Sequence, residues 1–347
     1  MLLSDLSHIN NCMKFFIGFL NYCLLLTIYC LLFSCSNPIP ENTNQPETAN
    51  KKPETSLPPT PSFNEDSAYS FVKAQVDFGP RIPGTAAHAK CADYLSAKLK
   101  SYRWEVQIQN GSITTYDGKK FNLKNIIASF KPEIANRILL ISHWDARPFA
   151  DSDTADADKP FDSADDGPSG VGVILEIVRQ FSISKPDLGI DILFDDLEDW
   201  GKNDDGGDNT WCLGTQYWAK NPHQPGYVAQ YGIVFDMVGA KGATFPQEGL
   251  SREYAPYIVK KIWNKAAHLG YSNYFIFDTA SSITDDHFYI NNFANIPCID
   301  IVNMNPPAKF GAHHHTHSDN MNIIDKNTLK AVGQTVLEIL WEEQHPL

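Results

Sequence analysis

The apolar positions of this chain alternate between two spacings. Strand signals fall at 104–108, 123–130, 137–142, 190–194, 233–238 and 296–302. Of these, 190–194 and 233–238 are short continuous apolar runs, typical of a sheet covered on both faces. Helical spacing of apolar residues falls at 67–76, 85–102, 168–181, 252–269, 285–290 and 327–341. This alternation predicts an α/β fold: a single domain with a mixed, largely parallel central β-sheet flanked by helices on both faces.

The N-terminus follows neither spacing. Phe15 to Phe33 is almost wholly apolar, with Lys14 before it and Cys35 after it. A basic residue, an apolar core and a small residue are typical of an export signal. Leu32-Phe33-Ser34-Cys35 resembles the bacterial lipobox, in which the cysteine is lipidated. We predict a lipoprotein signal over 1–35 and an exported protein, periplasmic or in the outer membrane, anchored through Cys35. A retained transmembrane anchor is the alternative, because the run approaches the ~20 residues that span a bilayer.

The next segment, 36–63, is dominated by Asn, Pro, Thr, Glu and Ser without an apolar period. Such a composition cannot bury enough surface to fold, so we predict a disordered tether. The catalytic domain is then expected over 64–347, a length that fits one large α/β domain.

Charge and cysteine usage narrow the class of protein. The formal net charge of −13 disfavours a nucleic-acid partner, because phosphates would be repelled. Four of the seven cysteines fall in the first 35 residues. The others, Cys91, Cys212 and Cys298, are too scattered for a metal-ligand spacing or a disulfide framework, so we expect buried free thiols.

Acidic and imidazole side chains follow several predicted strands or open a predicted helix. They are His143 and Asp145, the run Asp162 to Asp166, Asp196, Glu198 and Asp199, Asp236, and the run His313 to Asp319. Each alone has an ordinary structural explanation, such as a helix cap or a core histidine. Their repetition on one expected sheet edge favours a ligand site. Oxygen and imidazole donors without thiolate suit catalytic zinc.

These segments resemble, in their order, the landmarks of the zinc-dependent aminopeptidase and glutaminyl cyclase superfamily over roughly 65–345. The matching segments are His143-Trp144-Asp145, Ser163 to Gly170, Glu198-Asp199, Phe235 to Gly239 and His315-Thr316. Within that superfamily the chain is most similar to the bacterial glutaminyl cyclases. That closer match lies in Thr215 to Trp218, Asp236 to Ala240, Tyr271 to Phe275 and Thr284 to His287.

The resemblance implies a zinc-exopeptidase-like fold and assigns the site residues. Zinc would be held by Asp166, Asp199 and His315, with Glu198 as the general acid/base. Asp236 and Asp286 match acidic residues that line the cyclase pocket, and His314 falls where the animal enzymes carry a tryptophan.

Aromatic residues near these motifs suit a small apolar pocket for one side chain. Five aromatic residues lie near the proposed site in sequence: Trp144, Trp200, Trp211, Phe235 and Phe310. We expect about two of the five to serve the pocket, and we assign Trp200 and Trp211, together with His314, to its wall. Trp200 and Trp211 flank the acidic loop Lys202–Asn209, which we interpret as a solvated loop rather than a calcium site.

Two reactions share these ligands. A glutaminyl cyclase converts an N-terminal glutamine of a peptide or protein to pyroglutamate and releases ammonia, for which one zinc suffices. An aminopeptidase activates water between two metals, and the second metal would need His143 and Asp236, with Asp166 as the bridge. His143 and Asp145 are therefore candidates for a second metal or for supporting the first. The closer resemblance favours the cyclase, for which we expect one zinc ion. The ligands present are also compatible with two zinc ions. A binding protein that has lost activity is a third class, against which Glu198 argues.

Overall fold

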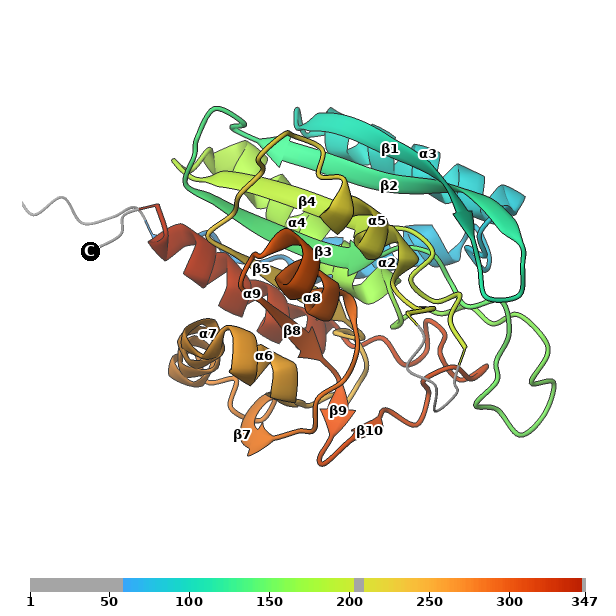
Figure 1. The fold of residues 1–347 in the computed structure, drawn as a ribbon. Helices are drawn as coiled ribbons and strands as arrows, with labels where there is room; N and C mark the ends of the chain where they lie inside the picture. The colour runs from blue at the N-terminus through green and yellow to red at the C-terminus, as the bar shows by residue number, and fades with distance from the viewer. Residues whose placement is uncertain (1–58, 203–208, 345–347) are drawn as a thin grey trace, which may run out of the picture. The chain divides into compact units, whose positions relative to one another are not determined.

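Six strands form one central β-sheet (Figure 1): β1 (Glu105–Thr114), β2 (Lys120–Phe130), β3 (Arg137–His143), β4 (Gly189–Asp195), β5 (Tyr231–Asp236) and β8 (Cys298–Val302). The structure is a computed structural model that describes residues 59–202 and 209–344. The strand order is β1-β2-β4-β3-β5-β8. The pairs among β4, β3, β5 and β8 are parallel, and β2 is antiparallel to β1 and β4. The predicted mixed, largely parallel sheet is confirmed.

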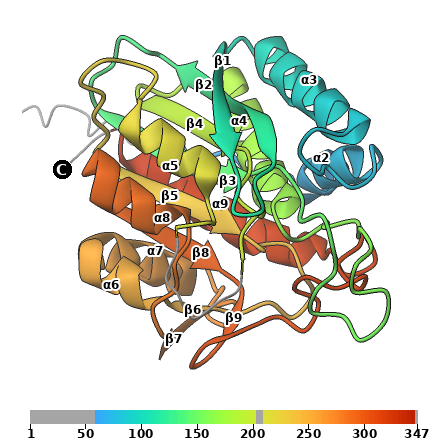
Figure 2. The ribbon, with the colours of Figure 1, turned by 45° about the vertical axis from the view of Figure 1, so that its right-hand side comes forward.

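Helices cover both faces of this sheet (Figure 2). One face is covered by α2 (Glu65–Val76), α3 (Ala86–Ser101), α4 (Pro168–Ser184) and α9 (Lys326–Glu342), and the other by α5 (Leu213–Lys220) and α8 (Asp286–Tyr289), which continues into the π-helical turn η1 (Ile290–Ala294). The pleat of β3 divides its side chains accordingly. Ile138 and Leu140 pack in the larger core, and Leu139 and Ile141 pack in the smaller core with Trp218.

Smaller elements complete the described part of the chain. They are α6 (Gly249–Tyr254), α7 (Pro256–His268), β6 (Phe245–Gln247) paired with β7 (Phe275–Thr279), and β9 (Met304–Asn305) paired with β10 (Lys309–Phe310). The single helix predicted over 252–269 is wrong. The helix is interrupted at Ala255, so that two helices form instead of one. Pro256, at the first position of α7, disfavours a helical conformation for the residue before it.

The packed domain begins slightly upstream of the predicted boundary at residue 64. The ring of Phe63 is buried against α9, where a Cβ on Gly333 would lie 2.2 Å from it. Thr60 donates a hydrogen bond to Glu338 at 2.6 Å. The last residues of the predicted tether therefore belong to the fold. The predicted signal, the rest of the tether and 203–208 of the acidic loop lie outside the described residues.

Two further observations concern the described part of the chain as a whole. Cys91, Cys212 and Cys298 are buried free thiols, as the sequence indicates. Within 59–202 and 209–344, no helix combines the length and the apolarity that crossing a bilayer requires.

Candidate active site

A cavity of about 460 Å³ opens beyond the C-terminal edge of the parallel strands. Its lining comes from the loops after β4 and β5, from β10 and the loop after it, from the turns before α4 and α8, and from α8 itself. The lining residues are Asp166, Glu198, Asp199, Lys202, Asn209, Trp211, Asp236, Met237, Ile283, Thr284, Asp285, Phe288, Tyr289, Phe310, His314 and His315. Segments up to 149 residues apart in sequence, from Asp166 to His315, thus meet at one edge of the sheet.

His315 brings the three predicted zinc ligands together. Its Nε2 lies 3.1 Å from an oxygen of Asp199 and 3.6 Å from one of Asp166. Its Nδ1 lies 3.3 Å from Asp151, a carboxylate that orients the ring. The residue has a left-handed backbone, φ 56°, which turns the imidazole inward from the loop after β10.

This cluster fits a cation. Burial alone would lower the pKa of His315, but Asp199 and Asp151 outweigh it and raise the pKa to about 10. In addition, the buried Oδ2 of Asp166 has no hydrogen-bond partner. Two carboxylates and one imidazole that demand positive charge between them are a suitable donor set for zinc.

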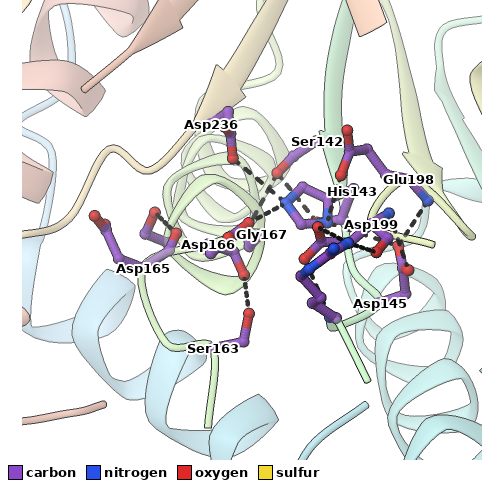
Figure 3. A network of polar contacts seen from close by, with 12 residues as sticks. Ser142, His143, Asp145, Ser163, Asp165, Asp166, Gly167, Glu198, Asp199 and Asp236 are labelled. Atoms are coloured by element: carbon purple, nitrogen blue, oxygen red, sulfur yellow. Dashed lines mark hydrogen bonds and ion pairs between the residues drawn. The ribbon is translucent and has the colours of Figure 1, made fainter. Parts of the chain in front are cut away.

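His143 is buried next to two residues of the site, Asp166 and Asp236 (Figure 3). Its Nε2 lies 3.0 Å from Asp166 and 3.3 Å from Asp236. The close approach requires glycine at 167, because a Cβ there would lie 2.9 Å from the imidazole, and the φ of +86° also favours glycine. The structure therefore places His143 where it can support the first metal or, with Asp166 and Asp236, bind a second.

Asp145, the other predicted residue of this group, lies 3.6 Å from His143 Nδ1 and also binds the backbone. Its carboxylate accepts hydrogen bonds from the N–H groups of Glu198 (3.1 Å) and Asp199 (3.4 Å). Asp319, which the sequence indicated only as part of the histidine-rich loop, binds the backbone of the other ligand loop in the same way. It accepts from the N–H groups of Ala164, Asp165 and Asp166 at 3.0, 2.7 and 3.2 Å. Both aspartates hold ligand-bearing loops in place.

Glu198 extends into the cavity next to Asp199. One oxygen accepts a hydrogen bond from the thiol of Cys212 at 3.2 Å, and the other lies 4.0 Å from His143 Nδ1. Burial raises the pKa of Glu198 well above its ordinary value, and Asp199, Asp285 and Asp286 add to this. A carboxylate with a raised pKa is suited to carrying a proton near neutrality.

The acidic wall differs from the prediction in one residue. Asp236 lines the cavity as expected, but the second acidic lining residue is Asp285 rather than the predicted Asp286. Asp285 caps α8 by accepting the N–H of Asp286, and Asp286 is buried beneath it. Burial and the neighbouring Asp285 raise the pKa of Asp286 to about 7. The Asp285-Asp286 pair was visible in the sequence, but its orientation depends on where α8 begins.

The aromatic wall also needs one correction. Trp211 and Phe310 line the cavity together with His314, and Trp211 stacks on His315 at 6.1 Å. Trp200 does not. Its ring packs 4.6 Å from Phe121 in a separate small core.

The remaining aromatics predicted near the site belong elsewhere. Trp144 stacks on His88 at 4.3 Å and Phe235 is buried in the main core. Tyr289, which the sequence interpretation did not single out, lines the cavity from α8.

Residues 125–340 match the model of peptidase family M28, which covers more than half of the chain. The chain belongs to peptidase family M28. Membership of this family indicates zinc as the metal, together with the grouping of Asp166, His314 and His315, whose donor atoms lie within 4.8 Å of one another.

Known relatives of this M28 chain include glutaminyl cyclases. A crystal structure of Porphyromonas gingivalis glutaminyl cyclase is 52% identical, covers 80% of this chain and 98% of that one, and has a TM-score of 0.78. A zinc-dependent exopeptidase from Parabacteroides distasonis is 50% identical, covers 82% of this chain and 100% of that one, and has a TM-score of 0.80. The Drosophila melanogaster glutaminyl-peptide cyclotransferase is 22% identical over 276 residues, 72% of this chain and 73% of that protein.

Proposed function

We propose that this protein is a zinc-dependent glutaminyl-peptide cyclotransferase, which converts the N-terminal glutamine of peptides or proteins to pyroglutamate and releases ammonia. The observation that carries the proposal is the position of Glu198 beside the cluster of Asp166, Asp199 and His315 in the cavity. The similarity to the P. gingivalis glutaminyl cyclase along the catalytic domain supports it.

The nucleophile of this reaction is part of the substrate. The free α-amine attacks the carbonyl carbon of its own side-chain amide, so a carbon–nitrogen bond forms and the bond to the amide nitrogen breaks. Zinc, when bound by Asp166, Asp199 and His315, supplies a Lewis acid for the amide oxygen. Glu198 takes a proton from the attacking amine and gives it to the leaving nitrogen, which departs as ammonia.

The other cavity residues orient the substrate in this proposal. Asp236 and Asp285 present carboxylate oxygens that accept hydrogen bonds from the substrate amine and amide. Trp211, Phe310 and His314 offer flat, largely apolar surfaces to the two methylenes of the glutamine side chain. We infer one working zinc per chain, at the site centred on His315.

A second candidate function is a dinuclear zinc aminopeptidase. The observation in its favour is the group formed by His143, Asp166 and Asp236, whose donor atoms lie within 4.8 Å of one another. Two adjacent metals would suit hydrolysis by an activated water. The similarity to the P. gingivalis glutaminyl cyclase favours the cyclase.

Incubation of the purified protein with two peptides separates these functions. One peptide begins with glutamine and the other with leucine, and mass spectrometry follows both. Loss of one ammonia from the glutamine peptide without chain shortening is the expected result. Removal of the first residue from either peptide would instead establish the aminopeptidase. Metal analysis of the same sample gives the number of zinc ions per chain, for which we expect one.

We also propose that the protein is exported and anchored in the membrane through a lipid on Cys35. The support is the apolar run from Phe15 to Phe33 followed by a lipobox-like segment. Detergent-phase partitioning of the wild type and of Cys35→Ser tests this. The wild type should enter the detergent phase and the variant should not. Equal partitioning of the two would contradict lipid anchoring.

A further inference from the structure

The thiol of Cys212 lies against the carboxylate that we propose as the proton carrier. Its Sγ is 3.2 Å from Glu198 Oε1, within hydrogen-bond distance for sulfur. Cys212 is fully buried, and its Sγ, a Glu198 oxygen and an Asp285 oxygen all lie within 4.8 Å of one another. The thiol therefore contacts Glu198 behind the cavity surface.

The backbone around Cys212 is rigidly connected to the loop that carries Glu198. The N–H of Cys212 donates to the carbonyl of Glu198 at 2.9 Å, and the N–H of Leu213 donates to that of Leu197 at 3.1 Å. The next residue, Gly214, packs so closely that a Cβ would lie 2.2 Å from the carbonyl oxygen of Asp196. The backbone hydrogen bonds between these two segments thus fix the position of the Cys212 sulfur relative to the Glu198 carboxylate.

The residue type at 212 is not what its backbone alone would favour. Cys212 has φ 53°, in the left-handed region where glycine and asparagine are the favoured residues. This backbone conformation does not favour cysteine, so we attribute the presence of cysteine at position 212 to its side chain.

The chemical state of the thiol suits a donor. Burial raises the pKa of Cys212 well above its ordinary value, and Asp286 and Glu198 add to this. The sulfur therefore keeps its proton at neutral pH. A thiol is a weak donor, so it can orient a carboxylate while withdrawing little of its basicity.

We propose that Cys212 is a positioning residue whose S–H donates a hydrogen bond to Glu198 Oε1 and keeps that carboxylate directed into the cavity. This inference rests on the proposed role of Glu198 as proton carrier. It extends that role to a residue that does not itself touch the substrate.

The kinetic test compares three variants on a glutamine-initiated peptide, with zinc content measured for each. Cys212→Ala should lower kcat about tenfold while KM and zinc content stay unchanged, because only the orientation of the Glu198 carboxylate is lost. Cys212→Ser, which restores a donor, should recover kcat to within about threefold of the wild type. The matched control is Cys298→Ala, whose buried sulfur contacts only the carbonyl of Ile299 among the hydrogen bonds of the described residues. It should behave as the wild type.

Two kinetic outcomes would overturn the inference. One is a wild-type kcat in Cys212→Ala. The other is an equal loss in the alanine and serine variants together with lost zinc, which indicates a merely structural role. If the wild type shortens peptides instead of cyclising them, the proposed cyclase is wrong, but the same comparison on peptide hydrolysis still decides the role of Cys212.

An infrared measurement tests the contact without any turnover. The S–H stretching band of Cys212 is identified by its absence in Cys212→Ala. In Glu198→Ala this band should move to the higher frequency of a thiol without an acceptor. An unmoved band would refute the hydrogen bond whatever reaction the enzyme catalyses.

Discussion

Buried carboxylates at two places, within the central sheet and at its C-terminal edge, differ in how they are paired. Asp191, within β4, has all its oxygens matched by the chain. Arg137 donates to both of them at 2.6 Å, Ser129 donates at 2.5 Å and Tyr227 at 2.8 Å. At the C-terminal edge, by contrast, Asp166 Oδ2 and Asp236 Oδ1 are buried without a hydrogen-bond partner.

This difference separates two uses of buried charge. A carboxylate whose partners all come from the chain contributes to the fold and leaves nothing for a ligand to bind. A group of carboxylates and imidazoles with unmatched atoms is costly in isolation, so it marks the place where a cation or a substrate completes the bonding. Mutations at the two places should therefore affect different properties.

The largest effect is expected at His315. His315→Ala removes the imidazole that lies against both Asp166 and Asp199, so bound zinc should fall from stoichiometric to trace and turnover should disappear. Metal analysis and ammonia release measure the two effects. His317→Ala, an exposed histidine of the same loop, is the control. A full complement of zinc in His315→Ala would remove this residue from the ligand set.

The next effect is expected at Glu198. Glu198→Gln keeps the shape of the side chain but cannot accept a proton, so kcat should fall about a thousandfold while zinc and KM are retained. Steady-state kinetics with metal analysis check this. Zinc loss in this variant would show that Glu198 is a ligand rather than the acid/base.

At Asp191, whose oxygens are matched by the chain, removing a partner should lower stability and leave activity unchanged. Arg137→Met leaves Asp191 buried with its main partner gone, which should cost about 3–5 kcal/mol of unfolding free energy. The kcat of the folded fraction should not change. Urea denaturation measures the loss, and Arg137→Met combined with Asp191→Leu should recover most of it. A lowered kcat in folded Arg137→Met would break the division between the two sites.

Glu248 extends the comparison to pH. Burial would raise the pKa of Glu248, but His287 and the N–H groups of Ser251 and Leu250 outweigh it and lower the pKa from 4.5 to about 2. Because the folded pKa is depressed, this stabilisation is fully present above pH 4.5 and is lost as the pH falls towards 2. Glu248→Gln should therefore be less stable than the wild type by about 2–3 kcal/mol at pH 7. The gap should close below pH 4.5 in urea titrations. A gap independent of pH would show that the lost charge is not the cause.

The smallest effect is expected at Asp300, where the substitution should raise the stability of the protein rather than lower it. Asp300 is fully buried with both oxygens unmatched, and burial, together with Asp285 and Asp236, raises its pKa well above 3.8. The contribution of Asp300 to stability therefore falls as the pH rises above 3.8, and this loss is absent from Asp300→Asn. The variant should be about 1 kcal/mol more stable at pH 7. Thermal unfolding at pH 4 and pH 7 would reveal the difference, and a less stable variant at pH 7 would contradict it.

Much of the fold follows from local sequence. Thr85 was predicted to begin a helix and caps α3 by accepting the N–H of His88 at 3.2 Å. The short apolar runs 190–194 and 233–238 lie in the buried strands β4 and β5. These features depend on residues within a few positions of one another, so the order of side chains carries the information. Helix α5 was missed because it begins after a left-handed Cys212 rather than a side-chain cap.

The sequence by itself determined the alternation of strands and helices, and it indicated which acidic and imidazole residues would follow the strands. Only the tertiary structure decided which of two candidate side chains faces the cavity: Asp285 rather than Asp286, and Trp211 rather than Trp200. Gly201 illustrates the reason, since a Cβ there would lie 1.8 Å from the Trp211 ring. Side-chain direction is set by packing between distant segments, and that contact is absent from the linear order of residues.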